Sequence, residues 1–227
     1  MKKTMKKAFF TSVPVMMGYI VLGVAFGMLL ESKGYGVIYA FIMSTFIYAG
    51  SMQFVAINLL TSGATLISAA IMTLLINARH IVYGLSMIKK FDKMQELKPY
   101  MIFSLTDETY SLLVGSSVPK ECHEKYYMFF ISFFDQCYWI IGSVIGSLVG
   151  SLITINTTGL DFAMTALFVV IVLEQFLTSQ KHIYTYIGFI ISIICLLLFG
   201  SEAFIIPSMI GIIISLMIMY KGEQSHA

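Results

Sequence analysis

The sequence predicts an all-α, polytopic membrane protein with seven to eight transmembrane segments. Hydrophobic residues fill 58% of the 227 positions, charged residues fill only 11%, and the mean hydropathy is +0.87. A soluble domain carries about a quarter charged residues. Here the apolar residues form runs of roughly 17 to 25, long enough to cross a ~30 Å hydrocarbon core as helix. These runs are continuous rather than alternating, which favours helices over a β-barrel.

Seven apolar runs account for the firm segments. They cover 8–30, 37–60, 64–88, 126–150, 161–178, 183–199 and 204–220. The first run follows four lysines and is too long for the hydrophobic region of a signal peptide, so we expect an uncleaved first span. A shorter amphipathic stretch, 99–115, is the eighth candidate, and it either crosses the membrane or re-enters from one side. We favour the crossing and treat 1–227 as a single transmembrane transporter domain.

Lysine positions predict the orientation, because cytoplasmic loops are enriched in lysine and arginine. The four lysines within residues 2–7 predict a cytoplasmic N-terminus. With eight crossings, Lys181 and Lys221 also fall inside, but the 89–98 loop with its four lysines falls outside. If 99–115 is re-entrant, the C-terminal loops break the rule instead.

A short internal repeat predicts two related halves, 8–115 and 126–220. The pattern Tyr-x3-Gly-x3-Gly occurs over residues 19–27 and again over residues 138–146. Internal repeats are common in secondary transporters, whose binding site lies where the repeats meet. Eight crossings would make this repeat parallel, and a re-entrant fourth segment would make it inverted. The glycines themselves resemble small-xxx-small stripes, which allow close helix packing.

Arg79 is the only arginine, and it lies within an apolar run, whereas every lysine lies at or beyond the end of one. A charge well inside a span costs about 2.5–3.5 kcal/mol on insertion scales and normally faces the protein interior beside an acid. Snorkelling to an interface is the alternative. However, Lys89 lies ten residues further on, which puts Arg79 about 15 Å deeper along the helix. Asn77 and His80 share one face of this helix.

Four carboxylates also fall within the segments. Asp107 and Glu108 lie in the 99–115 stretch, Asp135 follows two phenylalanines, and Glu174 closes the 161–178 run. One guanidinium cannot neutralise four acids, so we expect some to be protonated, to face a water-filled cavity or to meet a partner protein. Intramembrane acids form proton relays. The four are therefore candidates for proton coupling or ion pairing, with helix capping as the alternative for Asp135 and Glu174.

The second segment contains polar groups at depth in the sequence Tyr48-Ala-Gly-Ser-Met-Gln-Phe54. Gly50 and Ser51 weaken a helix in mid-run, and broken helices at the midplane expose backbone donors and acceptors that bind charged substrate groups. The alternative is a tolerated kink, with Ser51 bonded back to its own helix.

Other function classes lack their signatures. The sequence has no H-E-x-x-H motif, no glycine-rich phosphate loop and no cysteine–histidine spacing for a metal, so we predict no metal, cofactor or catalytic residue. The net charge of +2 comes from lysines in short loops and gives no reason to expect nucleic acid. Ser51 and His80 are the residue types of a serine–histidine dyad, but the sequence gives no further sign of one. A membrane-embedded enzyme is therefore the weaker alternative.

At these motifs the sequence resembles the AzlC-type branched-chain amino acid exporters, the large-subunit family of azaleucine-resistance proteins. The matching pieces are residues 48–54, Asn77-Ala-Arg-His80 with Tyr83-Gly84, Leu105-Thr-Asp-Glu-Thr109, and Thr165-Ala-Leu-Phe168 leading into Glu174-Gln175. Met52 departs from the pattern, because the family often has alanine there. The resemblance implies ion-driven export of leucine, isoleucine and valine. It also implies a partner in the lipid bilayer, a small, separately encoded AzlD-type subunit.

The sequence thus leads to the hypothesis of a secondary transporter subunit that works by alternating access. The expected substrate-binding residues are Tyr48, Gly50, Ser51, Gln53, Asn77, Arg79 and His80. Arg79 is expected to anchor the substrate carboxylate or to pair with Asp107 or Glu108, while Asp135 or Glu174 carries the proton. A non-transporting scaffold for a partner subunit and uptake rather than export are the remaining alternatives.

Overall fold

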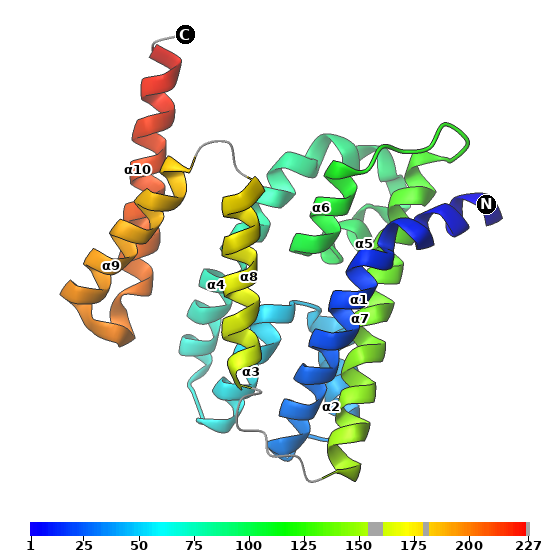
Figure 1. Ribbon diagram of the computed structural model, residues 1–227, viewed down its shortest axis with the longest axis horizontal. Helices are drawn as coiled ribbons and strands as arrows, with labels where there is room; N and C mark the ends of the chain where they lie inside the picture. Colours follow the sequence, from blue (N-terminus) through cyan, green and yellow to red (C-terminus); the bar gives the residue numbers. More distant parts are fainter. Residues whose placement is uncertain (154–160, 179–181, 226–227) are drawn as a thin grey trace. The chain divides into compact units, whose positions relative to one another are not determined.

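The computed structural model describes residues 1–153, 161–178 and 182–225, and all regular elements in these ranges are helices. In chain order they are α1 (Lys2–Ser32), α2 (Val37–Ile42) with a π-helical turn (Met43–Ile47), α3 (Gly50–Thr61), α4 (Leu66–Phe91), a 3-10 turn (Asp92–Leu97), α5 (Lys98–Phe103), α6 (Asp107–Gly115), α7 (Glu124–Leu152), α8 (Asp161–Thr178), α9 (Ile183–Ala203) and α10 (Ile205–Ser225). Figure 1 shows this order along the chain. The predicted all-α class is confirmed.

Within the described residues, three helices are long and apolar enough to cross a membrane. They are α1, α7 and the Ile183–Gly200 part of α9. A fourth candidate consists of two helical pieces, Leu66–Leu74 and Ile76–Phe103, bent by 40° at their junction. The seven to eight crossings predicted from hydropathy are not confirmed, and two of the predicted segments, 37–60 and 99–115, are each broken in the middle.

The chain forms two compact units, Met1–Thr165 and a second from Ala166 on. The second unit contains most of α8 together with a hairpin of α9 and α10. The hairpin turns at Gly200, whose φ of +74° is a backbone conformation that glycine adopts without strain. At Gly211 a Cβ atom would lie 3.0 Å from Ile191 Cγ2, so the two hairpin helices pack closely.

In the first unit, α1 and α7 pack along the two copies of the Tyr-x3-Gly-x3-Gly pattern. Gly23 lies against Gly142, and Gly27 lies against Gly146. The residue numbers of the contacting pairs increase in the same direction along both helices, so α1 and α7 run parallel. A Cβ on Gly142 would lie 2.8 Å from the Ile20 carbonyl oxygen, which is too close for any larger residue. The glycines therefore bring the two backbones into direct contact, as small-xxx-small stripes do.

This seam leads to a stability prediction. Gly27→Ala places a methyl group against the α7 backbone, 2.6 Å from Ser147 N, and we expect it to destabilise the folded protein by about 1–3 kcal/mol through overpacking. Gly18→Ala on the same helix is the matched control, because no atom lies within 4 Å of the position that its methyl group would take. Thermal unfolding of the detergent-purified variants measures the difference. Equal unfolding temperatures would contradict the close packing of α1 on α7.

The segment 37–61 re-enters on the side where α1 ends. The Thr45 carbonyl oxygen accepts a hydrogen bond from Gln136 Nε2 in the middle of α7, and Ser51 contacts Arg79 in the middle of α4, so the Tyr48–Ala49 break lies at mid-depth. From there α3 returns to the start of α4 through the short turn at 62–65. In Figure 1, α2 and α3 both lie in the lower half of the view, where α1 ends. The predicted second crossing is therefore a hairpin.

The segment 98–115 re-enters from the opposite side. Lys90 Nζ donates to the Leu113 carbonyl oxygen near the end of α6, and the side chain of Lys125 at the start of α7 donates to Gln95 Oε1, just before α5. The start of α5 and the end of α6 thus share one face of the molecule. The eight-crossing arrangement favoured by the sequence differs from this result. The physical reason is the break at 104–106, where Thr106 caps a new helix by accepting a hydrogen bond from Thr109 N.

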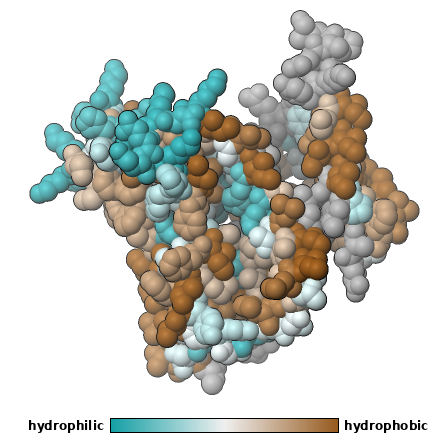
Figure 2. All heavy atoms as spheres, turned by 180° about the vertical axis from the view of Figure 1, so that it is seen from behind, coloured by the Kyte–Doolittle hydropathy of each residue, from teal (hydrophilic) through white to brown (hydrophobic). Residues whose placement is uncertain are grey.

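This topology also places the lysines. The Lys7–Glu121 ion pair joins the N-terminal end of α1 to the 116–123 loop, which lies on the same face as the 89–98 loop. Ten lysines share this lysine-rich face: Lys2, Lys3, Lys6, Lys7, Lys89, Lys90, Lys93, Lys98, Lys120 and Lys125. Among the described residues of the first unit, the opposite face has Lys33 alone. The expected exception at 89–98 therefore disappears, and Figure 2 shows the hydrophilic side chains gathered at one end of this unit.

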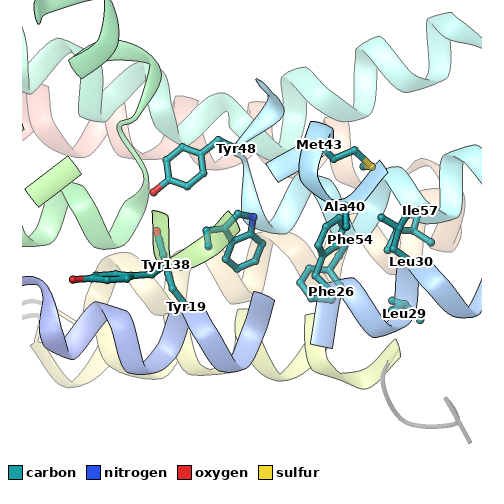
Figure 3. Packing of buried hydrophobic residues seen from close by; sticks show 11 residues of the cluster. Tyr19, Phe26, Leu29, Leu30, Ala40, Met43, Tyr48, Phe54, Ile57 and Tyr138 are labelled. Atoms are coloured by element: carbon teal, nitrogen blue, oxygen red, sulfur yellow. The ribbon is translucent and has the colours of Figure 1, made fainter. Parts of the chain in front are cut away.

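The α2/α3 hairpin packs against α1 and α7 through a buried apolar cluster (Figure 3). Its members are Tyr19, Phe26, Leu29, Leu30, Ala40, Met43, Tyr48, Phe54, Ile57, Tyr138 and Trp139. Phe26 packs edge-to-face on Phe54 with ring centres 5.6 Å apart. This cluster fills the half of the first unit that faces away from the lysine-rich face. In the first unit, each hairpin is followed by a long helix. The α2/α3 hairpin precedes α4 within 37–91, and the α5/α6 hairpin precedes α7 within 98–152. The two pairs run in opposite directions across the molecule.

Candidate functional site

The site forms where the two hairpins break. Tyr48 has φ +42° and ψ +49°, a left-handed conformation that is unusual for a bulky residue and is typical of functional sites. Tyr48 directly follows the π-helical turn, and α3 begins two residues after Tyr48, at Gly50. Its first backbone N–H groups have no partner within the helix, so this end attracts negative charge. The predicted break is present, although it falls at Tyr48–Ala49 rather than at Gly50–Ser51.

Arg79 of α4 connects the two breaks. Its Nη1 forms an ion pair with Asp107 in the first turn of α6, and its Nη2 donates to Ser51 Oγ in the first turn of α3 at 2.8 Å. The guanidinium suits this position because its planar fork donates in two directions at once. Of the pairings expected for Arg79, the structure forms the one with Asp107.

Several polar atoms around this pair are buried without a hydrogen-bond partner among the described residues. They are Arg79 Nε, Asp107 Oδ1, Asn77 Oδ1 and the Tyr48 hydroxyl. Tyr48 is only 3% exposed. A buried polar atom left without a partner costs about 1–3 kcal/mol, so a group of four requires an explanation. Both donors and acceptors occur in the group, which matches a ligand with both kinds of polar group.

A pocket of about 500 Å³ lies beside these atoms. Its lining combines the break, the middle and end of α4, and α5: Ile47, Tyr48, Ala49, Asn77, His80, Ile81, Gly84, Ile88, Phe91, Lys98, Ile102, Phe103 and Leu105. Tyr48 and Asn77 lie at its mid-depth end, and Lys98 lies at the lysine-rich face. The walls are mostly aliphatic and aromatic with a few polar groups, as is typical of small-molecule sites. Tyr48, Asn77 and His80 are thus placed around one cavity.

The other predicted substrate-binding residues, Gly50, Ser51, Gln53 and Arg79, are not among the residues that line the pocket. Gln53 is fully buried, accepts a hydrogen bond from Trp139 Nε1 at 2.8 Å and donates to Ser44 Oγ. A Cβ on Gly50 would contact the Trp139 ring at 3.4 Å. Both positions therefore pack α3 against α7 and fix where Ser51 lies. Glu174 belongs to α8, but its side chain lies outside the described residues.

The structure also joins two of the predicted acids through residues that sequence reasoning missed. The Tyr19 hydroxyl lies 2.8 Å from Glu108 Oε2 and 2.6 Å from Thr106 Oγ1. Thr106 Oγ1 lies 3.0 Å from Thr109 Oγ1, which lies 2.8 Å from Asp135 Oδ2. Tyr19 begins the repeated glycine pattern, which indicated helix packing but gave no sign of a polar role.

Comparison with known proteins identifies the family of this chain. The family profile described as AzlC protein matches residues 14–153. The Bacillus subtilis branched-chain amino acid transport protein AzlC is 40% identical over 216 residues, covering 95% of this chain and 85% of the relative. A Helicobacter pylori protein described as an uncharacterized membrane protein is 42% identical over 96% of both chains. The Escherichia coli inner membrane protein YgaZ is 30% identical over 177 residues, covering 75% of this chain and 72% of the relative.

No solved structure matches the chain. The family match covers both hairpins, the three helices around them and every described residue of the site. Together with the identity to the Bacillus subtilis transport protein, it confirms the resemblance that the motifs indicated. This chain is a membrane protein of the AzlC family.

Proposed function

We propose that this chain exports branched-chain amino acids across the bacterial inner membrane as the large subunit of a secondary transporter. The observation that carries the proposal is the pocket, which combines an aliphatic wall with two lining residues, Tyr48 and Asn77, whose buried polar atoms have no partner among the described residues. A zwitterionic amino acid with a branched side chain has both features. The Bacillus subtilis relative's name supports this substrate class.

In the proposed complex, the ammonium group contacts Asp107 Oδ1 and Asn77 Oδ1, which are both buried acceptors. The carboxylate lies at the start of α3 and contacts Arg79 Nε. The α3 dipole and the guanidinium both favour negative charge there. The side chain then occupies the wall formed by Ile81 and the other apolar lining residues. The substrate thereby supplies hydrogen-bond partners for these buried atoms.

The lysines support the direction of transport that we propose. By the positive-inside rule, the lysine-rich face is cytoplasmic, which also places the N-terminus there. The pocket extends from mid-depth to Lys98 on this face, while the opposite half is filled by the apolar cluster around Phe26 and Phe54. Access to the pocket from this face supports loading of the substrate from the cytoplasm, which export requires. Two hairpins of opposite direction around one site support alternating access, since inverted elements can exchange which side is open.

The energy source in this proposal is the proton gradient. Glu108 and Asp135 are the carriers we propose, because Asp107 is already paired with Arg79. We further propose an AzlD-type small membrane subunit as partner. Many large apolar side chains on the hairpins are exposed, among them Ile38, Phe41, Phe46 and Ile102, and they face lipid or such a subunit.

The proposal is tested by efflux of preloaded radiolabelled leucine, isoleucine and valine from cells lacking their own exporters. The chain is expressed with and without a candidate small subunit. We expect efflux that requires the subunit and exceeds efflux of lysine or glutamate, whose charged side chains do not fit the apolar wall. Correct membrane insertion and subunit assembly without efflux of any of the three amino acids would contradict the proposal and favour the scaffold alternative.

A further inference from the structure

Glu108 and Asp135 are connected by an unbroken row of three hydroxyl groups. In order, the row consists of Glu108 Oε2, the hydroxyls of Tyr19, Thr106 and Thr109, and Asp135 Oδ2. The four oxygen–oxygen distances are 2.8, 2.6, 3.0 and 2.8 Å. All four are hydrogen-bond lengths for hydroxyl groups. The row joins α1, α6 and α7, so tertiary packing alone assembles it.

The hydrogen atoms in this row can be counted. Each hydroxyl group supplies one hydrogen, so the three hydroxyls fill three of the four links. An ionised carboxylate supplies none. The fourth link therefore requires one more hydrogen, held by Glu108 or by Asp135. With both acids ionised, two oxygens would face each other at hydrogen-bond distance with no hydrogen between them.

Burial makes such an uncompensated contact costly. Thr109 and Asp135 are fully buried, and Tyr19 is 5% exposed. Asp135 Oδ1 has no hydrogen-bond partner, and no cation forms an ion pair with this carboxylate among the described residues. The titratable groups around it are Glu108 of α6, Tyr19 of α1, Tyr48 at the break, Tyr100 of α5 and Tyr138 on α7 itself. Arg79 forms its ion pair with Asp107 and donates a hydrogen bond to Ser51.

From this geometry we infer that Glu108 and Asp135 share a single proton through a wire made of the Tyr19, Thr106 and Thr109 hydroxyls. The inference rests on the proposed transport function and adds the path by which the proton leaves the substrate site. Glu108 is next to Asp107, the residue that takes the substrate ammonium. The path starts at Glu108, beside the proposed transport site, and ends at Asp135 of α7.

The transfer step balances. The Glu108 carboxyl O–H bond breaks as its proton joins the Tyr19 oxygen, and the Tyr19 proton passes to Thr106. The Thr106 proton passes to Thr109, and the Thr109 proton passes to Asp135 Oδ2. Four O–H bonds break and four form. Glu108 becomes a carboxylate, Asp135 becomes a carboxylic acid, and every hydroxyl ends with one hydrogen, turned in the opposite direction.

Removing one hydroxyl tests the wire. In proteoliposomes containing the chain and the proposed small subunit, we expect Tyr19→Phe and Thr109→Val to lower leucine transport driven by a pH gradient by about a hundredfold or more, the scale of a positioned proton transfer. Leucine–leucine exchange without a gradient moves no net proton and should stay within about threefold of wild type. Thr109→Ser, which restores the hydroxyl, should recover gradient-driven transport.

Tyr138→Phe is the matched control for Tyr19→Phe. Tyr138 occupies the same position in the second glycine pattern, is equally buried, and its hydroxyl bonds to Ser12 Oγ, outside the wire. We expect it to retain gradient-driven transport. Full gradient-driven transport in both Tyr19→Phe and Thr109→Val would overturn the wire. Absence of leucine exchange in wild type would instead overturn the proposed function.

A second measurement does not depend on transport. The infrared difference spectrum between wild type and the Glu108→Gln/Asp135→Asn double variant should contain one carboxylic acid C=O band at neutral pH. The band should shift in Thr109→Val, because one acid then loses its hydroxyl partner. Absence of any carboxylic acid band in this difference would overturn the shared proton, whatever the transport assay gives.

Discussion

Arg79→Ala is expected to abolish leucine transport and to destabilise the protein as well. Removing one partner of a buried, hydrogen-bonded charge pair costs about 2–5 kcal/mol. Because the Arg79 and Asp107 side chains are 26% and 17% exposed, we expect the lower end of this range, equivalent to a loss of about 30-fold in transport or binding. The cost arises because Asp107 remains as an unpaired carboxylate at the start of α6, and Ser51 loses its donor. Arg79→Lys should keep part of the stability but little of the transport, since an ammonium does not bridge Ser51 and Asp107 with a planar fork.

A double variant separates the two effects. Asp107→Asn removes the charge that Arg79→Ala leaves unpaired, so we expect the double variant to recover most of the lost thermal stability. It should still fail to transport leucine, because both groups that receive the zwitterion are gone. Initial rates of leucine efflux and unfolding temperatures, measured on the same membranes, give the comparison. Normal efflux in Arg79→Ala would remove the residue from the site.

Filling the pocket is expected to have the second large effect. Gly84 lines the pocket, and a Cβ placed on it meets no atom within 4 Å. Gly84→Leu therefore adds a side chain to the cavity without moving the backbone. We expect leucine transport to fall by about tenfold or more through steric overlap, while transport of the smaller alanine changes much less.

The control for this substitution is Gly18→Leu. Gly18 lies in α1, is equally free of atoms within 4 Å of its Cβ position and takes no part in the pocket lining. Uptake or efflux rates for leucine, valine and alanine are measured for both variants in parallel. An equal loss for all three amino acids in Gly84→Leu would indicate general damage rather than a side-chain pocket.

Local sequence features predicted several parts of the candidate site. Each feature is a residue type that is unfavourable in an apolar helix, and it can be recognised without knowing the fold. A lone arginine in an apolar run needs an acid, and Asp107 provides it. A Gly-Ser pair in mid-span indicates a break, and the break lies two residues away. A charged group or a broken helix is so unfavourable in a membrane that few structural arrangements can accommodate it.

The topology was harder to predict, because a hairpin that re-enters and a helix that crosses have similar hydropathy. The 37–60 run is long and apolar enough to cross, and only the strained Tyr48 backbone turns it back. The 98–115 segment was recognised as ambiguous, and contacts distant in sequence, such as Lys90 with Leu113, decide its direction. The lysines of the first unit are consistent with this topology, since re-entry of both 37–61 and 98–115 places ten of them on one face.

The row of hydroxyls could not be predicted from sequence. Tyr19, Thr106 and Thr109 are ordinary residues in apolar or helix-capping positions, and they meet only because α1 packs on α7 through glycines. The role of Gln53 was likewise undecided, since a mid-span glutamine fits a ligand or a packing contact equally well. Trp139 on α7 provides the packing contact.

The proposed function requires a branched-chain amino acid to bind between Arg79 and the apolar wall beside Gly84. Equilibrium binding of radiolabelled leucine to the purified complex tests it most directly, without any gradient. We expect saturable binding by wild type, competition by isoleucine and valine, loss of binding in Arg79→Ala, and weakened binding of leucine but not of alanine in Gly84→Leu. Leucine binding of wild-type strength in both variants would contradict it.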